Sequence, residues 1–234
     1  AGDQLWRRID SATWQRTRNP YAILQTTSND RFEQLARDPE FLQQLKQLLG
    51  ERNRYLNRAS WYQKTQNQPA LKTVAFFCME YGLGEALPFY AGGLGILSGD
   101  FLKAASDLGI PMVAVGLLFQ QGYFRQMLDN SGWQLEFYPG CDTASLPIAP
   151  AISDSGGWLK VPLDLPGRRV WLRVWQVEVG RVRLYLLDSN HPLNNPLDRG
   201  ITNQLYPAQQ ENRFLQQLAL GVGGWRALMA LSLE

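Results

Sequence analysis

Hydrophobic residues near the N-terminus recur mostly at helical spacing, and turn or capping signals divide this stretch into several helices. Asn19-Pro20 breaks the first helical pattern, because proline disfavours a helical conformation in the residue before it. Asn29 or Asp30 is placed to cap a following helix. At Asp38-Pro39 a capping residue precedes proline at the first helical position, which predicts another helix start. Residues 1–66 are therefore predicted to form an N-terminal helical region.

The next part of the chain has the order strand, loop, helix, strand. Val74–Met79 is an apolar run without alternation, which is typical of a parallel strand buried on both faces. A glycine-rich loop, Gly82–Gly95, follows it, and the helical stretch Ile96–Leu108 ends at Gly109. A second apolar run covers Pro111–Leu118. This order predicts a βαβ unit in an open α/β sheet.

Residues 121–190 show a different pattern, in which hydrophobic residues alternate with others as they do in half-buried strands. The alternating positions are Leu159, Val161 and Leu163, then Val170, Leu172 and Val174, then Val182, Leu184 and Leu186. Turn signals at Pro166-Gly167 and Gly180 separate these runs. The pattern predicts an antiparallel meander that is inserted into, or packed on, the α/β unit.

Helical patterning over residues 208–228 is still strong close to the last residue. One βαβ unit is too little sheet for a stable doubly wound domain, so we expect that the chain is truncated and that more should follow. The predicted fold class is α/β. Residues 1–66 form the helical region, and residues 67–234 form the first part of an α/β domain with an antiparallel insertion at about 121–190.

Composition narrows the classes of function. Hydrophobic residues make up 45% of the 234 positions, and the formal net charge of +2 is scattered, so no nucleic-acid partner is expected. No apolar run reaches the roughly 18 residues that a membrane span requires, so no membrane partner is expected. Two cysteines, Cys78 and Cys141, do not make a disulfide framework, which favours a reducing, cytoplasmic location. No Cys/His cluster has metal-ligand spacing, so no metal site is predicted.

The glycine-rich segment Gly82–Gly95 is the strongest candidate for a functional site. It follows a predicted strand, and open α/β sheets bind ligands at the carboxyl ends of their strands. Gly92, Gly93 and Gly95 lie just before a predicted helix, where free backbone N–H groups favour an anion such as phosphate. A tight turn that only connects strand and helix would use the same residues, so both interpretations stay open. The spacing matches neither a dinucleotide fingerprint nor a P-loop.

The motifs around this loop resemble those of the α-glucan phosphorylases, especially of their shorter bacterial type. The matching segments are Met79-Glu80, Leu87–Gly95, Gly99-Asp100, Ser106–Gly109 and Val115–Gln126. The resemblance covers nearly the whole chain, as an N-terminal portion only. It implies a Rossmann-like half of the two-domain glycosyltransferase architecture called GT-B. It also implies an activity, the transfer of a terminal α-1,4-linked glucosyl unit of glycogen, starch or maltodextrin to inorganic phosphate, which gives α-glucose 1-phosphate.

The resemblance also implies roles for individual residues. Gly92 and Gly93 match the loop beside the reacting phosphate, and Gly93 matches a position near the phosphate group of the family's cofactor, pyridoxal phosphate. Leu94 matches a residue that contacts the glucosyl unit, and Glu80 matches a carboxylate at the sugar site. A carboxylate at a strand end also serves to pair with a nearby arginine, and this structural interpretation of Glu80 stays open. Backbone N–H donors aimed at phosphate stabilise negative charge without a bulky side chain, which agrees with the role implied for the glycines.

The cofactor lysine and the remaining catalytic groups of the family match no motif in this chain, so no complete catalytic set is expected and the 234 residues alone are predicted to be inactive. The implied partners are an α-1,4-glucan, inorganic phosphate and glucose 1-phosphate, and a homodimer stays open. Two alternatives remain. One is a sugar-nucleotide glycosyltransferase of the glycogen-synthase kind, against which Tyr90-Ala91 stands where that class usually has Lys-Thr. The other is a truncated homologue that binds glucan or regulates a partner.

Overall fold

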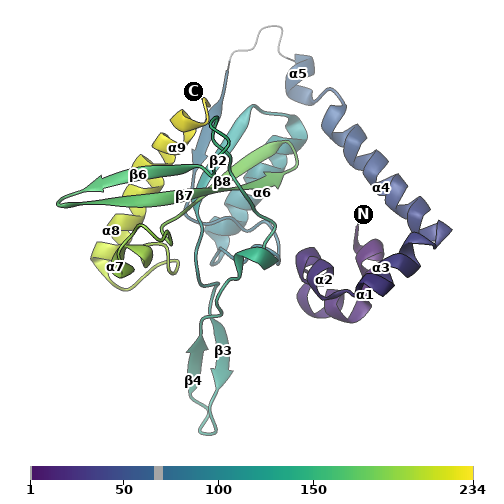
Figure 1. The fold of residues 1–234 in the computed structure, drawn as a ribbon, viewed down its shortest axis with the longest axis horizontal. Coiled ribbons are helices and arrows are strands. Elements are labelled where there is room, and N and C mark those ends of the chain that lie inside the picture. The colour runs from purple at the N-terminus through teal and green to yellow at the C-terminus, as the bar shows by residue number, and fades with distance from the viewer. Residues whose placement is uncertain (1, 66–70, 234) are drawn as a thin grey trace.

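The computed structural model describes residues 2–65 and 71–233, and its first part is a group of helices with a small core of its own (Figure 1). These helices are α1 (Asp3–Thr17), α2 (Pro20–Thr26), α3 (Asn29–Ala36), α4 (Pro39–Asn57) and α5 (Trp61–Thr65). Their shared core is made by Leu5, Ile9, Ile23, Leu35 and Phe41. The predicted boundary between the helical region and the α/β domain, at residues 66 and 67, lies outside the described residues.

Capping side chains start these helices close to the predicted positions. The Asp38 carboxylate accepts hydrogen bonds from two backbone N–H groups at the start of α4, as predicted. The cap of α3 is Ser28, whose hydroxyl accepts from the Arg31 N–H. The prediction of Asn29 or Asp30 as this cap is therefore wrong by one or two positions. Ser28 has the extended backbone that a capping residue requires, whereas Asn29 and Asp30 already lie inside the helix.

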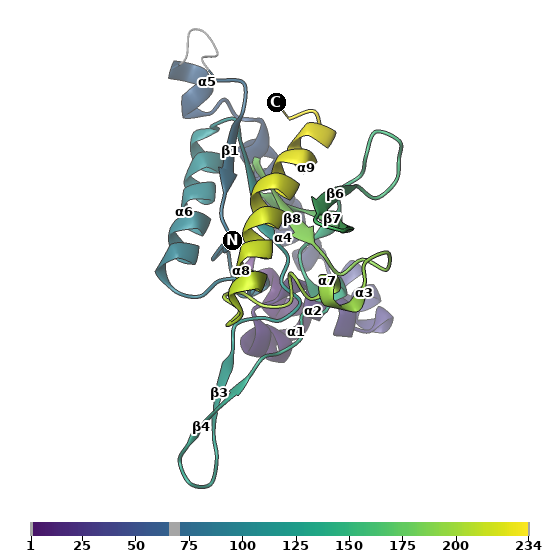
Figure 2. The ribbon, with the colours of Figure 1, turned by 90° about the vertical axis from the view of Figure 1, so that its left-hand side faces the viewer.

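The second part of the described chain is built around a six-stranded sheet of order β1-β2-β8-β7-β5, in which β6 also pairs with β7. Its strands are β1 (Val74–Phe77), β2 (Met112–Leu117), β5 (Ala149–Pro150), β6 (Lys160–Leu165), β7 (Arg168–Val179) and β8 (Val182–Asp188). A separate hairpin, β3 (Arg125–Leu128) with β4 (Gln134–Phe137), projects away from this sheet in both views (Figures 1 and 2). The helices are α6 (Gly93–Leu108), α7 (Pro196–Arg199), α8 (Gln210–Leu218) and α9 (Gly224–Ala230), with a 3-10 turn at Thr143–Ser145.

The elements β1, α6 and β2 form the predicted βαβ unit. β1 and β2 pair in parallel, with Val74 opposite Met112 and Phe77 opposite Val115. β2 is buried along its whole length, as expected of a central parallel strand. The prediction that the first strand is buried on both faces is wrong. β1 is the edge strand of the described sheet, and Ala75 is exposed.

The predicted antiparallel strands are present, and the turns at Pro166-Gly167 and Gly180 connect β6 to β7 and β7 to β8. They do not form a separate layer on the α/β unit, because β8 also pairs in parallel with β2. Gly116 of β2, for example, lies opposite Leu186 of β8. One mixed sheet therefore runs through both regions, and the chain has the predicted mixed α/β class.

Helices cover both faces of this sheet (Figure 2). α6 lies on one side of it, and α8 and α9 lie on the other. The helix predicted over residues 208–228 is present as α8 and α9, which are joined by a π-helical turn at Ala219–Gly223. Loops follow the parallel strands at their carboxyl ends, and these loops are described next.

Candidate functional site

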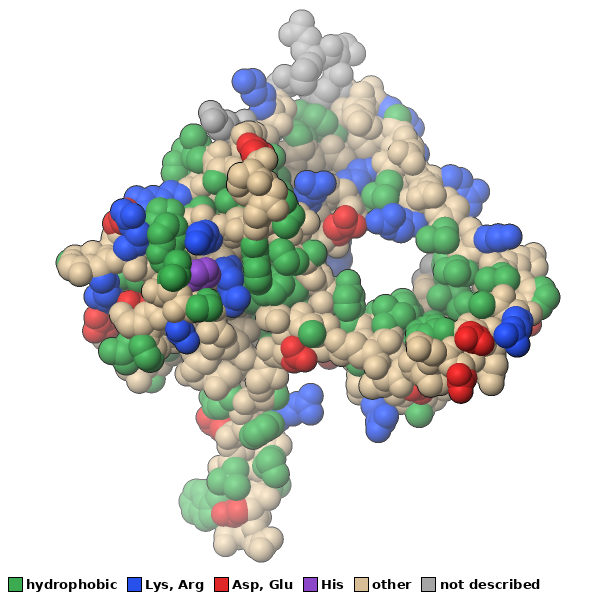
Figure 3. All heavy atoms as spheres, in the orientation of Figure 1, with side chains coloured by type: hydrophobic (Ala, Val, Ile, Leu, Met, Phe, Trp, Pro, Cys, Tyr) green, Lys and Arg blue, Asp and Glu red, His purple; other side chains and the backbone are tan. Residues whose placement is uncertain are grey.

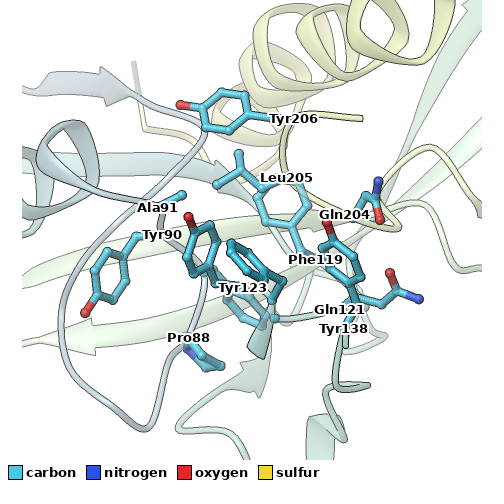
Figure 4. Close-up of a pocket in the computed structure, with 13 residues that line it drawn as sticks. Pro88, Tyr90, Ala91, Phe119, Gln121, Tyr123, Tyr138, Gln204, Leu205 and Tyr206 are labelled. Carbon is cyan, nitrogen blue, oxygen red and sulfur yellow. The ribbon is translucent and has the colours of Figure 1, made fainter. Parts of the chain in front are cut away.

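Three loops meet at the edge of the sheet where the parallel strands end. Residues 78–92 follow β1, residues 118–124 follow β2, and residues 189–207 follow β8. A pocket of about 220 Å³ lies between these loops (Figure 4). It is lined by Pro88, Phe89, Tyr90, Ala91, Phe119, Gln121, Gly122, Tyr123, Phe124, Tyr138, Gln204, Leu205 and Tyr206. Open α/β sheets bind ligands at this edge, and part of the glycine-rich loop lines the pocket. The predicted site residues Glu80, Gly92, Gly93 and Leu94 are not among its lining residues.

Glu80 belongs to the first loop and is buried, with 1% of its surface exposed. Its Oε2 accepts a hydrogen bond of 2.6 Å from the Ala91 N–H. Its Oε1 accepts a hydrogen bond from the hydroxyl of Tyr206, which comes from the loop after β8. Among the described residues no arginine forms an ion pair with Glu80. The carboxylate is thus held by neutral donors, and the alternative of a simple pair with arginine does not describe its surroundings.

The contact between Tyr206 and Glu80 was not predicted from the sequence. The ring of Tyr206 lines the pocket and is about half exposed, while its hydroxyl reaches the buried Glu80 carboxylate. Burial, followed by the hydrogen bond to Glu80, raises the pKa of Tyr206 to about 12, so its hydroxyl stays a protonated donor at neutral pH. The two residues are 126 positions apart, and no motif or spacing in the sequence links them.

Some glycines of the loop are required by packing. A Cβ on Gly95 would lie 2.4 Å from the Cβ of Tyr90 and 2.9 Å from Oε2 of Glu80. A Cβ on Gly99 would lie 2.3 Å from the backbone oxygen of Gly82. The backbone of α6 therefore lies directly against the backbone of the loop, and a larger residue at either position would force them apart.

Gly92 and Gly93 are different, because a Cβ on either residue would meet no atom within 4 Å. Gly92 has a φ of 86° and a ψ of −154°, a conformation that is essentially restricted to glycine. Gly93 opens the helix with no positive φ, so neither packing nor backbone conformation requires a glycine there. Its missing side chain leaves open space in front of the first turn of α6. Of the two readings left open by the sequence, a tight turn explains Gly92 but does not explain Gly93.

The start of α6 carries unused donors. The helix is 16 residues long, and Gly92 offers no side chain to cap it. Within the described chain the N–H groups of Gly93 and Leu94 donate to no protein acceptor, and both residues are exposed. The aligned peptide dipoles add partial positive charge at this end, so the first turn can hold an anion. The structure places Glu80 next to Gly92 through the Ala91 contact. The roles of Glu80, Gly92, Gly93 and Leu94 stay predictions.

Comparisons with known proteins bear on the same region. A family model described as a protein of unknown function, DUF3417, matches residues 1–87. The chain is 39% identical over 231 residues to a maltodextrin phosphorylase of Thermococcus litoralis. The aligned region covers 99% of this chain and 28% of that protein. The chain is 44% identical over 233 residues to a glycogen phosphorylase of Mycobacterium tuberculosis, with 97% and 27% covered. A glycogen phosphorylase of Aquifex aeolicus is 37% identical over 221 residues, with 94% and 31% covered.

The matches place the chain among homologues of glycosyltransferases, the class of enzyme to which phosphorylases belong. More particularly, the chain belongs to the α-glucan phosphorylase family and corresponds to an N-terminal portion of its members, as the loop motifs predicted. It spans less than a third of the length of these relatives. In the part of the chain that the structure describes, no helix combines the length and the apolarity needed to cross a membrane.

Proposed function

We propose that this chain is the N-terminal part of an α-1,4-glucan phosphorylase, which moves a terminal glucosyl unit of glycogen, starch or maltodextrin to inorganic phosphate and releases α-glucose 1-phosphate. The observation that carries this proposal is the first turn of α6, where Gly93 is open to solvent and the N–H groups have no acceptor within the described residues. A phosphate ion satisfies such donors without a competing side chain. The names of the phosphorylase relatives support inorganic phosphate as the ligand of this turn.

Each predicted site residue has a part in this proposal. Gly92 turns the chain so that the donors at Gly93 face the ligand, and its backbone conformation excludes other residues. Leu94, 53% exposed on the first turn, contacts the glucosyl unit. The carboxylate of Glu80 holds Ala91, and the family match assigns this carboxylate to the sugar site. Fixed donors at the start of a helix stabilise the negative charge of the attacking phosphate, and they need no reorganisation during the reaction.

The cofactor of the family fits the same surroundings. The open space at Gly93 and the uncapped first turn of α6 suit a phosphate group, either that of inorganic phosphate or that of pyridoxal phosphate. When bound, pyridoxal phosphate supplies a phosphate group for acid–base work. In the complete protein, Gly92 and Gly93 would form one side of the space that this group shares with the substrate. The family's cofactor-binding lysine has no matching motif in this chain.

The architecture follows from the same proposal. The mixed sheet and its two helical layers form the first part of a Rossmann-like domain, which faces a second one across a cleft in the GT-B arrangement. The carboxyl edge of β1, β2 and β8 would line one wall of that cleft. The helices α1 to α5, between Asp3 and Thr65, precede this domain. The relatives are more than three times as long as this chain, so the opposite wall comes from further sequence and the chain alone has no phosphorylase activity.

The test uses the full-length protein that contains this chain. It is incubated with maltodextrin or glycogen, with and without inorganic phosphate and with and without pyridoxal phosphate, and glucose 1-phosphate is measured. We expect product only when phosphate and cofactor are both present. Release of nucleoside diphosphate from a sugar nucleotide, with no glucose 1-phosphate, would support the glycogen-synthase alternative. Glucan binding without either reaction would support a binding or regulatory homologue.

A further inference from the structure

Tyr206 joins two loops that are far apart in the sequence. Its hydroxyl donates to Oε1 of Glu80, and Oε2 of the same carboxylate accepts from the Ala91 N–H at 2.6 Å. Ala91 directly precedes Gly92, the N-cap residue of α6. A continuous path of contacts therefore runs from the loop after β8, through one buried carboxylate, to the first turn of α6. Each oxygen of that carboxylate has one donor, so its orientation is fixed from two sides.

The conformation of Tyr206 is unusual for a residue that only fills space. Its φ of 55° lies in the left-handed region, which residues with a Cβ rarely adopt. Pro207 follows it, and a residue before proline prefers an extended conformation. The residue is 48% exposed, so its burial gives limited compensation. In this conformation the hydroxyl of Tyr206 donates to Oε1 of Glu80.

We propose that Tyr206 is a positioning residue for the phosphate-binding turn: it holds Glu80, and Glu80 in turn holds Ala91 so that the N–H groups of Gly93 and Leu94 face the bound phosphate. This inference rests on the proposed function, because it assigns the phosphate to that turn. Tyr206 is not a catalytic residue, since it acts through Glu80 and the loop. Its raised pKa, about 12, keeps the phenol protonated and able to donate throughout the neutral range.

Because Tyr206 positions the phosphate-binding turn, loss of its hydroxyl should weaken phosphate binding, which the loss of a purely structural hydroxyl would not do. A hydrogen bond to a charged acceptor is stronger than one between neutral groups, and its loss leaves Oε1 of a buried carboxylate without its donor. Freed on that side, Glu80 no longer fixes Ala91, and the first turn of α6 presents its donors less accurately. Phosphate binding should weaken, whereas the glucan, which reaches the protein along a much larger surface, should be held almost as before.

The experiment compares the full-length protein with its Tyr206→Phe variant. We expect the KM for inorganic phosphate to rise about 10- to 100-fold, with the KM for glucan within about twofold. Titration calorimetry with inorganic phosphate should show a loss of affinity of similar size. Tyr21→Phe is the matched control, because it removes a hydroxyl from a half-exposed tyrosine on α2, far in sequence from the loops, and should change neither value.

A double-mutant cycle separates positioning through Glu80 from a general loss of packing. Glu80→Gln should raise the KM for phosphate as well, and adding Tyr206→Phe to it should have almost no further effect, because the two residues act as one unit. Fully additive effects would overturn the inference. If Tyr206→Phe fails to fold, Glu80→Gln alone must still raise the KM for phosphate, and an unchanged KM for phosphate would equally overturn the inference.

The outcomes also distinguish this inference from the proposed function. If the wild-type protein makes glucose 1-phosphate and Tyr206→Phe keeps both KM values, the inference fails and the phosphorylase proposal stands. If the wild-type protein makes no glucose 1-phosphate, the phosphorylase proposal fails. In that case calorimetry with inorganic phosphate still decides the inference: weaker binding by Tyr206→Phe supports it, and equal binding, or no binding by the wild type, overturns it.

Discussion

The backbone of Gly99 in α6 lies against the backbone carbonyl of Gly82, so closely that a Cβ on Gly99 would be 2.3 Å from the carbonyl oxygen and 2.7 Å from its carbon. The Gly82 N–H in turn donates a 2.7 Å hydrogen bond to the oxygen of Gly95. Helix and loop are thus one packed unit, and the position of the first turn of α6 depends on residues along the next turn.

Gly99→Ala should therefore separate α6 from the loop. The partner is backbone, which cannot rotate away as a flexible side chain can, so we expect a loss of stability of about 1–3 kcal/mol. The measurement is the midpoint of denaturant unfolding. Gly84→Ala is the control, because a Cβ there meets no atom within 4 Å, and its effect should stay within about 0.5 kcal/mol. Equal midpoints for the two variants would contradict the described packing.

The order of elements could be predicted from the sequence because it depends on local signals. Asp38-Pro39 gives the start of α4, Gly109 takes the left-handed conformation that ends α6, and the apolar runs give β1 and β2. Gly180 has a φ of 62° at the turn between β7 and β8, as its position between two alternating runs predicts. These features are decided within a few residues of the chain.

The rest depends on pairing across long distances in the chain. Whether β8 lies beside β2 depends on the assembled sheet, and the alternation of Val182, Leu184 and Leu186 is the same in either arrangement. The exposure of Ala75 follows from which strands flank β1, which an apolar run does not reveal. The Tyr206–Glu80 hydrogen bond requires two loops to meet at one sheet edge. The family motifs indicated Glu80 and the glycines, but no local pattern indicated their partner.

Arg181 fastens the N-terminal helical region to the sheet. Its guanidinium donates to the backbone oxygens of Ser106 and Tyr55, and it stacks 4.2 Å from the centre of the Tyr55 ring. We expect Arg181→Met to loosen the end of α4, because one side chain supplies both charge-assisted hydrogen bonds and the cation–π contact. Hydrogen–deuterium exchange of the last turns of α4 should become at least about tenfold faster. Arg183→Met, at an exposed position on β8, should leave exchange in α4 unchanged.

Cys141 should be a slow nucleophile. Burial raises the pKa of its thiol to about 11 from an ordinary value of 9.0, so the reactive thiolate is scarce at neutral pH. The sign for stability follows: the thiol form is favoured by folding, so this contribution is complete below pH 9 and is lost as the pH rises towards 11. Alkylation by iodoacetamide, followed by mass spectrometry at pH 8, 9, 10 and 11, should show labelling that rises steeply only above pH 9. The unfolded chain in urea is the control, and it should already react near pH 8–9. Equal rates for folded and unfolded protein would contradict the burial of this thiol.

Gly92 and Gly93 allow the two explanations of the glycine pair to be separated by mutation. Gly92→Ala places a Cβ at a φ of 86°, so it should cost about 1–3 kcal/mol of stability through backbone strain. Gly93→Ala meets no neighbour and adopts a helical backbone, so it should leave stability unchanged or raise it by up to about 1 kcal/mol. In the full-length protein the added methyl group nevertheless stands where we place the phosphate, and we expect the KM for phosphate to rise about tenfold or more. Thermal unfolding and phosphate kinetics on the same two variants make the comparison. A Gly93→Ala protein with wild-type stability and a wild-type KM for phosphate would show that the pair is only a turn, because an alanine would then be tolerated at the position where ligand approach alone requires a glycine.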